Sequence, residues 1–255
     1  MTNEKNYVQV LDHGYIRLRN LAGPTPRPID DVMIYSARDE DVPQTARKSF
    51  NNGKVYTYEE DMQLADYLYR NMHTSPFEMI ESWWDIKLPI FADRQWVRHR
   101  TWGRNESSGR YVKLCSDYYL PTEKDVMLKA ASVKQGGRPI NLDNREECRI
   151  AEDFLDNLRV QCERSYKFYE HFLQRGVAPE QARMFLHVNF YVEWTGKVDL
   201  HNLLHFLTLR THEHAQYEIR IYAWAMVSML REFIPGLMDL WNNYELKMVK
   251  RGKII

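Results

Sequence analysis

Polar side chains that could do chemistry are concentrated between residues 98 and 111. This stretch of fourteen residues holds four arginines, a histidine, a glutamate, an asparagine and two serines. Guanidinium groups pair well with phosphate and carboxylate oxygens, and a Ser-Ser-Gly step lets backbone N–H groups approach an anion closely. The stretch therefore indicates a pocket for a phosphorylated ligand. A solvated turn whose arginines pair with nearby acids is the alternative.

Histidines form a second concentration, at positions 201, 205, 212 and 214. His201 and His205 are one helical turn apart, a spacing that can hold zinc. On a continuous helix His212 and His214 would point roughly 200° apart, so they could not both add ligands to the same face. We therefore expect no metal here and interpret the histidines as hydrogen-bonded or ligand-contacting side chains.

Two further arginines are candidates for ligand contact. Arg210 follows the apolar segment 206–209, and an unpaired buried cation is costly, so it must be paired, reach water or face a ligand. Its ordinary partner would be Glu213 or Glu218. Arg183 lies in a segment with helical character and could equally be a surface charge.

The order of these residues resembles that of the flavin-dependent thymidylate synthase family. Arg98, His99 and Arg100, followed after seven residues by Ser108, match the family signature, and its longer form agrees at 105, 106 and 109–111. The segments 73–78 and 209–218 match two further family elements. The resemblance runs from about residue 60 to about residue 235.

The resemblance implies an FAD-dependent methyltransferase. It would transfer a one-carbon unit from methylenetetrahydrofolate to C5 of dUMP, giving dTMP, with NADPH as reductant. Other thymidylate synthases activate that carbon with a cysteine in a Pro-Cys context. No cysteine of this chain follows a proline, so we expect no cysteine nucleophile, and the protein would contribute positioning and electrostatics. Family members are homotetramers, which predicts self-association.

Carried over position by position, the resemblance assigns three groups of site residues. Arg210 would stabilise the anionic pyrimidine ring and Ser108 would donate a hydrogen bond, so both are catalytic candidates. The FAD site would contain Ser75, Arg98, His99, Arg100, Asn105, Glu106, Asp199, His201, His205 and His214. The dUMP site would contain Gln95, Arg98, Glu106, Ser107, Ser108, Gly109, Arg110, Arg183 and Arg210.

The chain also departs from the family pattern. Gly103 replaces a serine, Met79 a histidine and His187 a proline, and the family's Asn-x-Arg element is written here as Asp199-Leu-His201. These changes leave open a related enzyme that hydroxymethylates dUMP or acts on dCMP. A non-catalytic flavin- or nucleotide-binding protein and a metal-dependent hydrolase are weaker alternatives.

The elements that must position these residues can be read from hydrophobic spacing. The spacing predicts an α+β fold in which helix dominates, and the resemblance implies an antiparallel-type sheet with long helices. We expect helices over 57–72, 90–98, 149–175, 179–186 and 199–233, strands over 83–88 and 188–195, and extended chain over 111–114. Ser75–Glu78 has the sequence of a capping box.

Composition limits the remaining possibilities. The chain is 44% apolar, which is enough for a substantial core, and reads as one domain over 1–255 with an extended arm over about 1–30 and an insertion over about 122–144. Lys and Arg number 35 and Asp and Glu number 35, a balance that argues against nucleic-acid or membrane binding. Three widely spaced cysteines, a polar N-terminal segment and the lack of a long apolar run predict a cytoplasmic protein with reduced thiols.

Overall fold

The computed structural model describes residues 6–29, 32–50, 53–130 and 137–246. Its centre is a six-stranded sheet with the strand order β1-β2-β4-β8-β5, in which β3 also pairs with β2. Each pairing in this sheet is antiparallel. The strands are β1 (Tyr7–Val10), β2 (Gly14–Ile29), β3 (Val32–Ser36), β4 (Glu81–Pro89), β5 (Gly103–Glu106) and β8 (Tyr191–Asp199).

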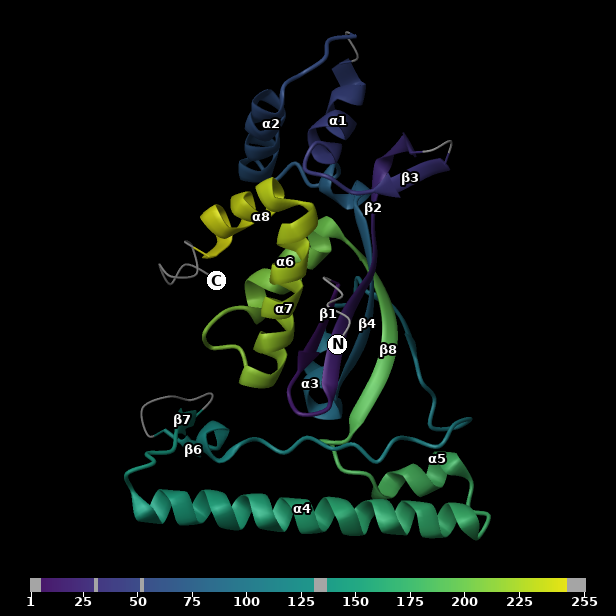
Figure 1. Cartoon of the computed structure of the whole chain (residues 1–255), viewed down its shortest axis with the longest axis vertical. Helices are drawn as coiled ribbons and strands as arrows, with labels where there is room; N and C mark the ends of the chain where they lie inside the picture. The colour runs from purple at the N-terminus through teal and green to yellow at the C-terminus, as the bar shows by residue number, and fades with distance from the viewer. Residues whose placement is uncertain (1–5, 30–31, 51–52, 131–136, 247–255) are drawn as a thin grey trace.

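Helices cover one face of this sheet, with α1 and α2 at one end of the molecule and α4 lying across the other end (Figure 1). None of the described helices is long and apolar enough to cross a membrane. The bounds are α1 (Asp41–Arg47), α2 (Tyr58–Arg70), α3 (Ile90–Trp96), α4 (Arg145–Gln174), α5 (Pro179–Ala182), α6 (Leu200–Arg210), α7 (Tyr217–Phe233) and α8 (Pro235–Trp241). Short helical turns span Lys48–Phe50, Phe77–Met79, Glu123–Asp125, Arg183–Phe185 and Asn242–Leu246. The fold is α+β with helix dominant, as predicted.

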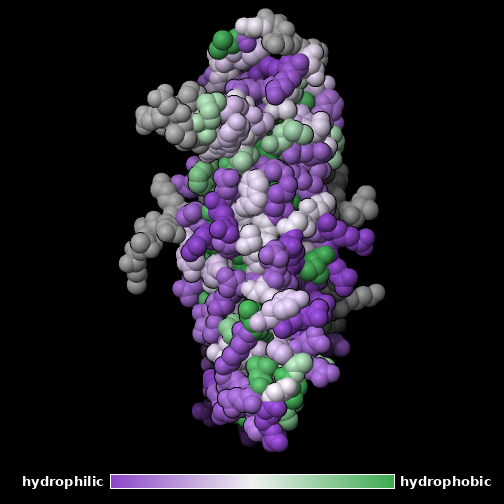
Figure 2. Space-filling view, turned by 90° about the vertical axis from the view of Figure 1, so that its right-hand side faces the viewer, coloured by the Kyte–Doolittle hydropathy of each residue, from purple (hydrophilic) through white to green (hydrophobic). Residues whose placement is uncertain are grey.

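The central strand β4 shows why the sheet packs on one side only. Its side chains alternate between buried and half-buried positions, the period expected of a strand with one covered face. Trp84, Ile86 and Leu88 are fully buried beneath the helices. The opposite face carries cross-strand polar pairs such as Arg19–Asp85 and Lys197–Glu81, and the view from that side is mainly hydrophilic (Figure 2).

A glycine allows the helical layer to approach the edge of the sheet. A Cβ on Gly14, at the start of β2, would lie 2.0 Å from Tyr222 Oη of α7. That hydroxyl donates a hydrogen bond to the Lys87 carbonyl of β4 at 2.6 Å. The contact joins α7 to two strands and leaves no room for a side chain at residue 14.

The predicted N-terminal arm is instead part of the sheet. β2 is hydrogen-bonded to β1 on one side and to β4 on the other. Its side chains Ile16, Leu18 and Leu21 are 4% exposed or less, so this segment contributes directly to the core. The segment is extended, as expected. The interpretation of it as an arm is wrong, because its backbone pairs with β1 and β4 and its apolar side chains are buried in the core.

Another local prediction is wrong. Ser75–Glu78 does not form a capping box, since the N-cap of the turn Phe77–Met79 is Pro76, which makes no side-chain cap. A capping box occurs instead at Thr57 and Glu60, at the start of α2. Residues 111–114, expected as extended chain, consist of a turn and bend at 111–112 and irregular chain at 113–114.

The predicted helix over 199–233 is divided into α6 and α7 by the turn 211–216. In this turn the His212 Nδ1 atom accepts a hydrogen bond from the His214 backbone N–H at 3.0 Å. Such a local side-chain bond competes with the helical pattern. The start of the helical region was correctly predicted, because the Asp199 carboxylate accepts from the Asn202 N–H at 2.9 Å.

The helix expected over 149–175 is observed as α4, which begins earlier, after the N-cap Asn144. The segment expected as a helix over 179–186 is α5 followed by a 3₁₀ turn. In the region 122–144, β6 (Met127–Lys129) pairs with β7 (Gly137–Pro139), and residues 131–136 lie outside the described part. Val126 and Ile140 pack with Ala151 of α4 as a small separate core.

Candidate active site

Arg210, at the C-terminal end of α6, is held by neutral groups. Its Nε donates to His99 Nε2 at 3.0 Å, Nη1 donates to Gln95 Oε1 at 3.3 Å and Nη2 donates to the Gln95 carbonyl at 3.1 Å. Gln95 belongs to α3 and His99 follows it. The ion pair with Glu213 or Glu218 that composition allowed is not among the described contacts of Arg210. Its guanidinium is half-buried, and among the described residues no carboxylate is paired with it.

The imidazole of His99 is neutral in this arrangement. Because its Nε2 accepts the Arg210 N–H, the ring carries its proton on Nδ1. Burial, the adjacent Arg210 cation and His205 together lower the pKa of His99 to about 4. Burial also lowers the pKa of Arg210, but an arginine remains cationic at neutral pH. The pair thus presents one positive charge and no negative one.

A cluster of aromatic rings packs against the His99 imidazole. The His99 ring lies edge-on to Phe206 with centroids 4.8 Å apart, and Phe206 stacks on Trp96 at 4.4 Å. Trp96 also contacts Trp102 and Trp194 edge-to-face, at 5.4 Å and 5.2 Å. Such packing confines each ring to one orientation, so the side chains of α3 and α6 at the site are positioned in advance.

The last part of the signature, residues 107–111, follows β5, the edge strand paired with β8. The Ser107 N–H donates to the Glu193 carbonyl of β8 at 3.0 Å, and the Ser108 carbonyl accepts from Tyr111 and Val112 N–H groups in a tight turn. Gly109 is buried in this turn. A Cβ there would lie 3.2 Å from Arg183 Cδ and 3.0 Å from Leu114 Cδ1. The turn and the Arg183 side chain are therefore in contact, although they are far apart in sequence.

Arg110 and Arg183 form an open cationic cluster at this turn. Arg110 Nε donates to Glu180 Oε2 at 2.9 Å, with the two side chains 57% and 49% exposed. Arg183 Nε donates to the Glu180 carbonyl at 3.4 Å. Three sequence-predicted dUMP residues, Ser108, Gly109 and Arg110, thus lie beside a fourth, Arg183. Together they offer hydroxyl, backbone and guanidinium donors to an anion.

Glu106 lies next to two residues that sequence analysis did not identify. Arg104 Nη2 is 2.7 Å from Asp93 Oδ1 and 3.5 Å from Glu106 Oε2. Burial and the Asp93 charge raise the pKa of Glu106, whereas Arg104 and Arg183 oppose that shift. The available signal was the alternation of Arg104 and Glu106 on one strand, but Asp93 comes from a helix and only the fold brings it close.

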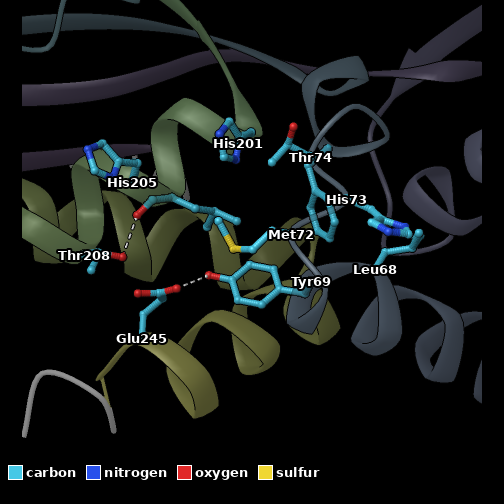
Figure 3. A pocket seen from close by; sticks show the side chains of 11 residues that line it. Leu68, Tyr69, Met72, His73, Thr74, His201, His205, Thr208 and Glu245 are labelled. Carbon is cyan, nitrogen blue, oxygen red and sulfur yellow. Dashed lines mark hydrogen bonds between the residues drawn. The ribbon is translucent and has the colours of Figure 1, made fainter. Parts of the chain in front are cut away.

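A pocket of about 100 Å³ lies between α2, α6 and the turn Asn242–Leu246. Figure 3 shows His201 and His205 one turn apart on α6, with Thr74 opposite His201. Tyr69 Oη donates to Glu245 Oε1 at 3.2 Å at the side of the pocket. Its apolar walls are Leu68, Met72, Phe77 and Leu204.

Other predicted FAD residues are not in this pocket. Asp199 caps α6, Ser75 is exposed beside Pro76, and His214 is exposed in the turn after α6. The predicted residues Arg98, Arg100 and Asn105 are exposed within the signature. The described contacts therefore form two groups of dUMP candidates, Gln95 with Arg210 and the turn at Gly109 with Arg183.

The geometry of His212 and His214 differs from expectation. They lie in a turn rather than on a helix, and their ring centroids are 4.9 Å apart, so the angular separation calculated for a helix does not apply. Across the residues that the structure describes, no three His, Cys, Asp or Glu side chains are arranged to hold a metal ion.

Comparisons with known proteins identify the family and the fold. A family model described as thymidylate synthase complementing protein matches residues 31–236. A flavin-dependent thymidylate synthase of Ehrlichia ruminantium (strain Gardel) is 42% identical over 227 residues, covering 89% of this chain and 70% of the relative. The flavin-dependent thymidylate synthase of Wolbachia pipientis wMel is 40% identical over 240 residues, covering 94% and 77%.

A solved structure shares the fold. The crystal structure of the UMP/dUMP methylase PolB from Streptomyces cacaoi, bound with 5-Br dUMP, superposes with a TM-score of 0.77 at 24% identity, covering 93% of this chain and 98% of that one. The sequence relatives extend the agreement from the fold to the family. The signature, the arrangement of its arginines and these matches lead to one conclusion: the chain is an enzyme that belongs to the flavin-dependent thymidylate synthase family.

Proposed function

We propose that this enzyme transfers a one-carbon unit from methylenetetrahydrofolate to C5 of dUMP and gives dTMP, using FAD and NADPH. The observation that carries the proposal is the half-buried Arg210 guanidinium, whose described partners are all neutral. An uncompensated cation in such a setting stabilises negative charge on a ligand more strongly than a cation in water.

The nucleotide phosphate is held by the cluster at the signature turn. Arg110 and Arg183 supply guanidinium donors. Ser108 Oγ accepts the Arg110 backbone N–H at 3.3 Å, so its own proton can be donated to a ligand oxygen. Gly109 brings the backbone of the turn within reach, since a side chain there would press against Arg183. These donors fix the position of the nucleotide and make Ser108 a hydrogen-bond donor rather than a nucleophile.

Arg210 acts on the base. With its guanidinium at the carbonyl edge and N3 of the uracil ring, it stabilises the anionic form of the ring as electron density moves towards C5. His99 and Gln95 hold the guanidinium plane in position. Because His99 is neutral at neutral pH, its ring does not repel the Arg210 guanidinium. It also adds no second positive charge beside the base.

The pocket beside α6 fits part of a flavin cofactor. Its apolar walls suit a flat aromatic ring, and the His201 and His205 imidazoles with the Thr74 hydroxyl offer donors to polar atoms of the ligand. These residues would hold FAD together with residues of the signature segment. The flavin, reduced by NADPH, would supply the hydride.

The positions of the three cysteines support a mechanism without a thiol. Cys162 is buried on α4 beside Asn189, and Cys148 also lies on α4, whereas Cys115 contacts the Tyr191 carbonyl. Burial raises the pKa of all three thiols, which keeps them protonated at neutral pH. A thiol poised as a nucleophile would require the opposite shift.

We also infer that the enzyme assembles as a homotetramer. The surface of α4 carries Ile150, Phe154, Val160 and Phe168, which are between 40% and 59% exposed. Apolar side chains repeated along one helix at the surface are typical of subunit contacts. Figure 1 shows α4 at the end of the molecule, where a second copy can reach it. Association would also explain why one subunit leaves several FAD candidates exposed.

Product analysis tests the proposal. Purified enzyme is incubated with dUMP, methylenetetrahydrofolate and NADPH, and the nucleotide mass is measured, with dCMP in a parallel reaction. We expect dUMP to gain one CH₂ unit, and dCMP to remain unchanged. A gain of CH₂O, or reaction of dCMP, would replace this activity by one of the related ones.

The cofactor is tested on the same preparation. The purified protein should be yellow, with an oxidised-flavin absorbance spectrum. Flavin without any nucleotide product would indicate a binding protein that does not turn over. A colourless protein that takes up zinc would favour a hydrolase.

A further inference from the structure

Glu106 shares one face of β5 with Arg104, because residues two apart on a strand point the same way. The register places Glu106 opposite Trp194 and Arg104 opposite Gly196 on β8. Gly196 has no side chain to fill the space, and a Cβ there would lie 2.5 Å from the Trp194 ring. The Trp194 and Trp102 rings occupy this space, and the Arg104 guanidinium lies over the Trp194 ring, 4.0 Å from its centroid.

Asp93, in the first turn of α3, contacts both Arg104 and Trp194. Its Oδ1 accepts from Arg104 Nη2 at 2.7 Å and from Trp194 Nε1 at 2.9 Å. Asp93 and Arg104 are mostly buried, with side chains 10% and 15% exposed. Arg104 Nη1 is buried without a protein hydrogen-bond partner. The guanidinium is therefore held in place by Asp93 and Trp194 while its Nη2 also faces Glu106.

The charges around Glu106 oppose one another. Asp93 disfavours a second carboxylate nearby, and Arg104, Arg183 and Arg94 favour it. Arg104 is the most enclosed of the three cations, since Arg94 and Arg183 are exposed and more strongly screened by water. Asp93 also draws the Arg104 guanidinium towards itself, because their distance is 0.8 Å shorter than the distance from Arg104 to Glu106 (2.7 Å against 3.5 Å).

We propose that Asp93 and Arg104 are positioning residues that set the direction and the ionisation of the Glu106 carboxylate in the nucleotide site. Arg104 keeps Glu106 ionised, and Asp93 limits that effect by sharing the same guanidinium. The inference rests on the proposed function in that Glu106 is taken to contact the bound nucleotide or flavin. It assigns a role to residues 93 and 104 that the family signature does not require.

The two partners of this ion pair should act in opposite directions. Without the Arg104 cation, Glu106 takes up a proton at higher pH. Without the Asp93 charge, the whole guanidinium is available to Glu106, which then takes up a proton only at lower pH. A nearby opposite charge lowers a carboxyl pKa by about one to three units. If the ion pair were purely structural, replacing Asp93 and replacing Arg104 would cause the same loss of stability.

The experiment is a calorimetric titration of the flavin-loaded enzyme with dUMP at a series of pH values from 5 to 8. In Glu106→Gln the pH dependence of dUMP binding that is due to Glu106 is absent, which identifies that part of the wild-type profile. We expect Arg104→Gln to raise the midpoint of this part by about one pH unit and Asp93→Asn to lower it. The phosphate of dUMP titrates identically in every variant and cancels in the comparison.

Arg47 provides a matched control. It pairs with the buried Asp61 of α2 and lies over the Tyr56 ring at 3.6 Å, so Arg47→Gln removes a similar ion pair at the α1–α2 end. We expect it to leave the pH midpoint of dUMP binding unchanged. Arg104→Lys retains the charge and should keep the midpoint near that of the wild type, even if Arg104→Gln does not fold.

The outcomes separate this inference from the proposed function. Opposite shifts for residues 93 and 104 support the positioning role. Shifts in the same direction, or midpoints that match the Arg47→Gln control, overturn it while dUMP binding still supports the proposed activity. Absence of dUMP binding by the wild-type enzyme would overturn the proposed function itself.

Discussion

The two arginine clusters of the site are built differently. Arg210 lies at the end of a helix above a packed aromatic cluster, is half-buried and bonds only to the neutral groups of His99 and Gln95. Arg110 lies in a surface turn and pairs with Glu180, and both side chains are about half exposed. In the mechanism that we propose, the first cluster is organised before a ligand arrives. The second would exchange the Glu180 carboxylate for the ligand and so contribute to binding more than to rate.

The sharpest test of this contrast is Arg210→Ala. We expect turnover to fall by about 10²- to 10³-fold or more, the loss typical of removing a preorganised donor from a charge-developing site. The flavin absorbance of the purified variant should be retained. Arg210→Lys is the control, since it keeps a charge but loses the planar fork and should recover only part of the rate. Turnover close to that of the wild type in Arg210→Ala would remove Arg210 from the mechanism.

The stability of the cluster formed by Arg210, His99 and Gln95 should also depend on pH. The folded-state pKa of His99, about 4, lies below the ordinary value of about 6.5. The unfolded chain therefore binds more protons between these values, and stability is lost as the pH falls from about 6.5 to 4. The difference between these two pKa values corresponds to about 3 kcal/mol. Because His99 is only partly buried, screening by water makes the loss attributable to it smaller.

Chemical denaturation at several pH values measures this loss. His99→Gln keeps a hydrogen-bond acceptor for Arg210 and does not titrate, so its stability should depend less steeply on pH. Equal slopes for the two proteins would mean that burial and the neighbouring Arg210 do not hold His99 neutral in the folded protein.

Arg183→Ala addresses the exposed cluster. A guanidinium contact with a phosphate is worth about 1.5–3 kcal/mol, so we expect KM for dUMP to rise about tenfold or more. The value of kcat should change little, because this contact is made in the ground state and in the transition state alike. Steady-state kinetics with varied dUMP gives both constants. A fall in kcat with KM unchanged would place Arg183 with Arg210 instead.

The smallest effect is expected from Glu180→Gln. This change removes the carboxylate that competes with the nucleotide phosphate for Arg110. Exposed ion pairs contribute up to about 1 kcal/mol, so dUMP affinity should increase by no more than about fivefold. Calorimetric titration would detect the gain. Weaker binding would show that Glu180 orients Arg110 rather than competing for it.

Local sequence patterns predicted several elements well. The helix at 57–72, the long helix α4 and the Asp199 cap of α6 depend on residues close in sequence, and they are observed. The position of β2 inside the sheet was not predicted, because one of its partners, β4, lies about 60 to 70 residues away in the sequence. Non-local pairing leaves no local trace beyond an extended, partly apolar segment.

The site shows the same division. The family resemblance assigned Gln95, His99 and Arg210 to the site, and the fold brings them into hydrogen-bond contact. The resemblance did not identify Asp93 or Arg104. The turn after Arg210 was also missed, so the geometric reason given against a shared position of His212 and His214 was wrong.

The sequence by itself determined the family, the helical segments and the residue types available for chemistry, because these depend on residue identity and short-range spacing. Only the tertiary structure decided which of these groups are ionised and which of the charged groups are paired. Burial and close contacts hold His99 neutral, leave Arg210 without a carboxylate and divide Arg104 between Asp93 and Glu106. Hydration and Coulomb interactions depend on distances in space, and those distances exist only once the chain has folded.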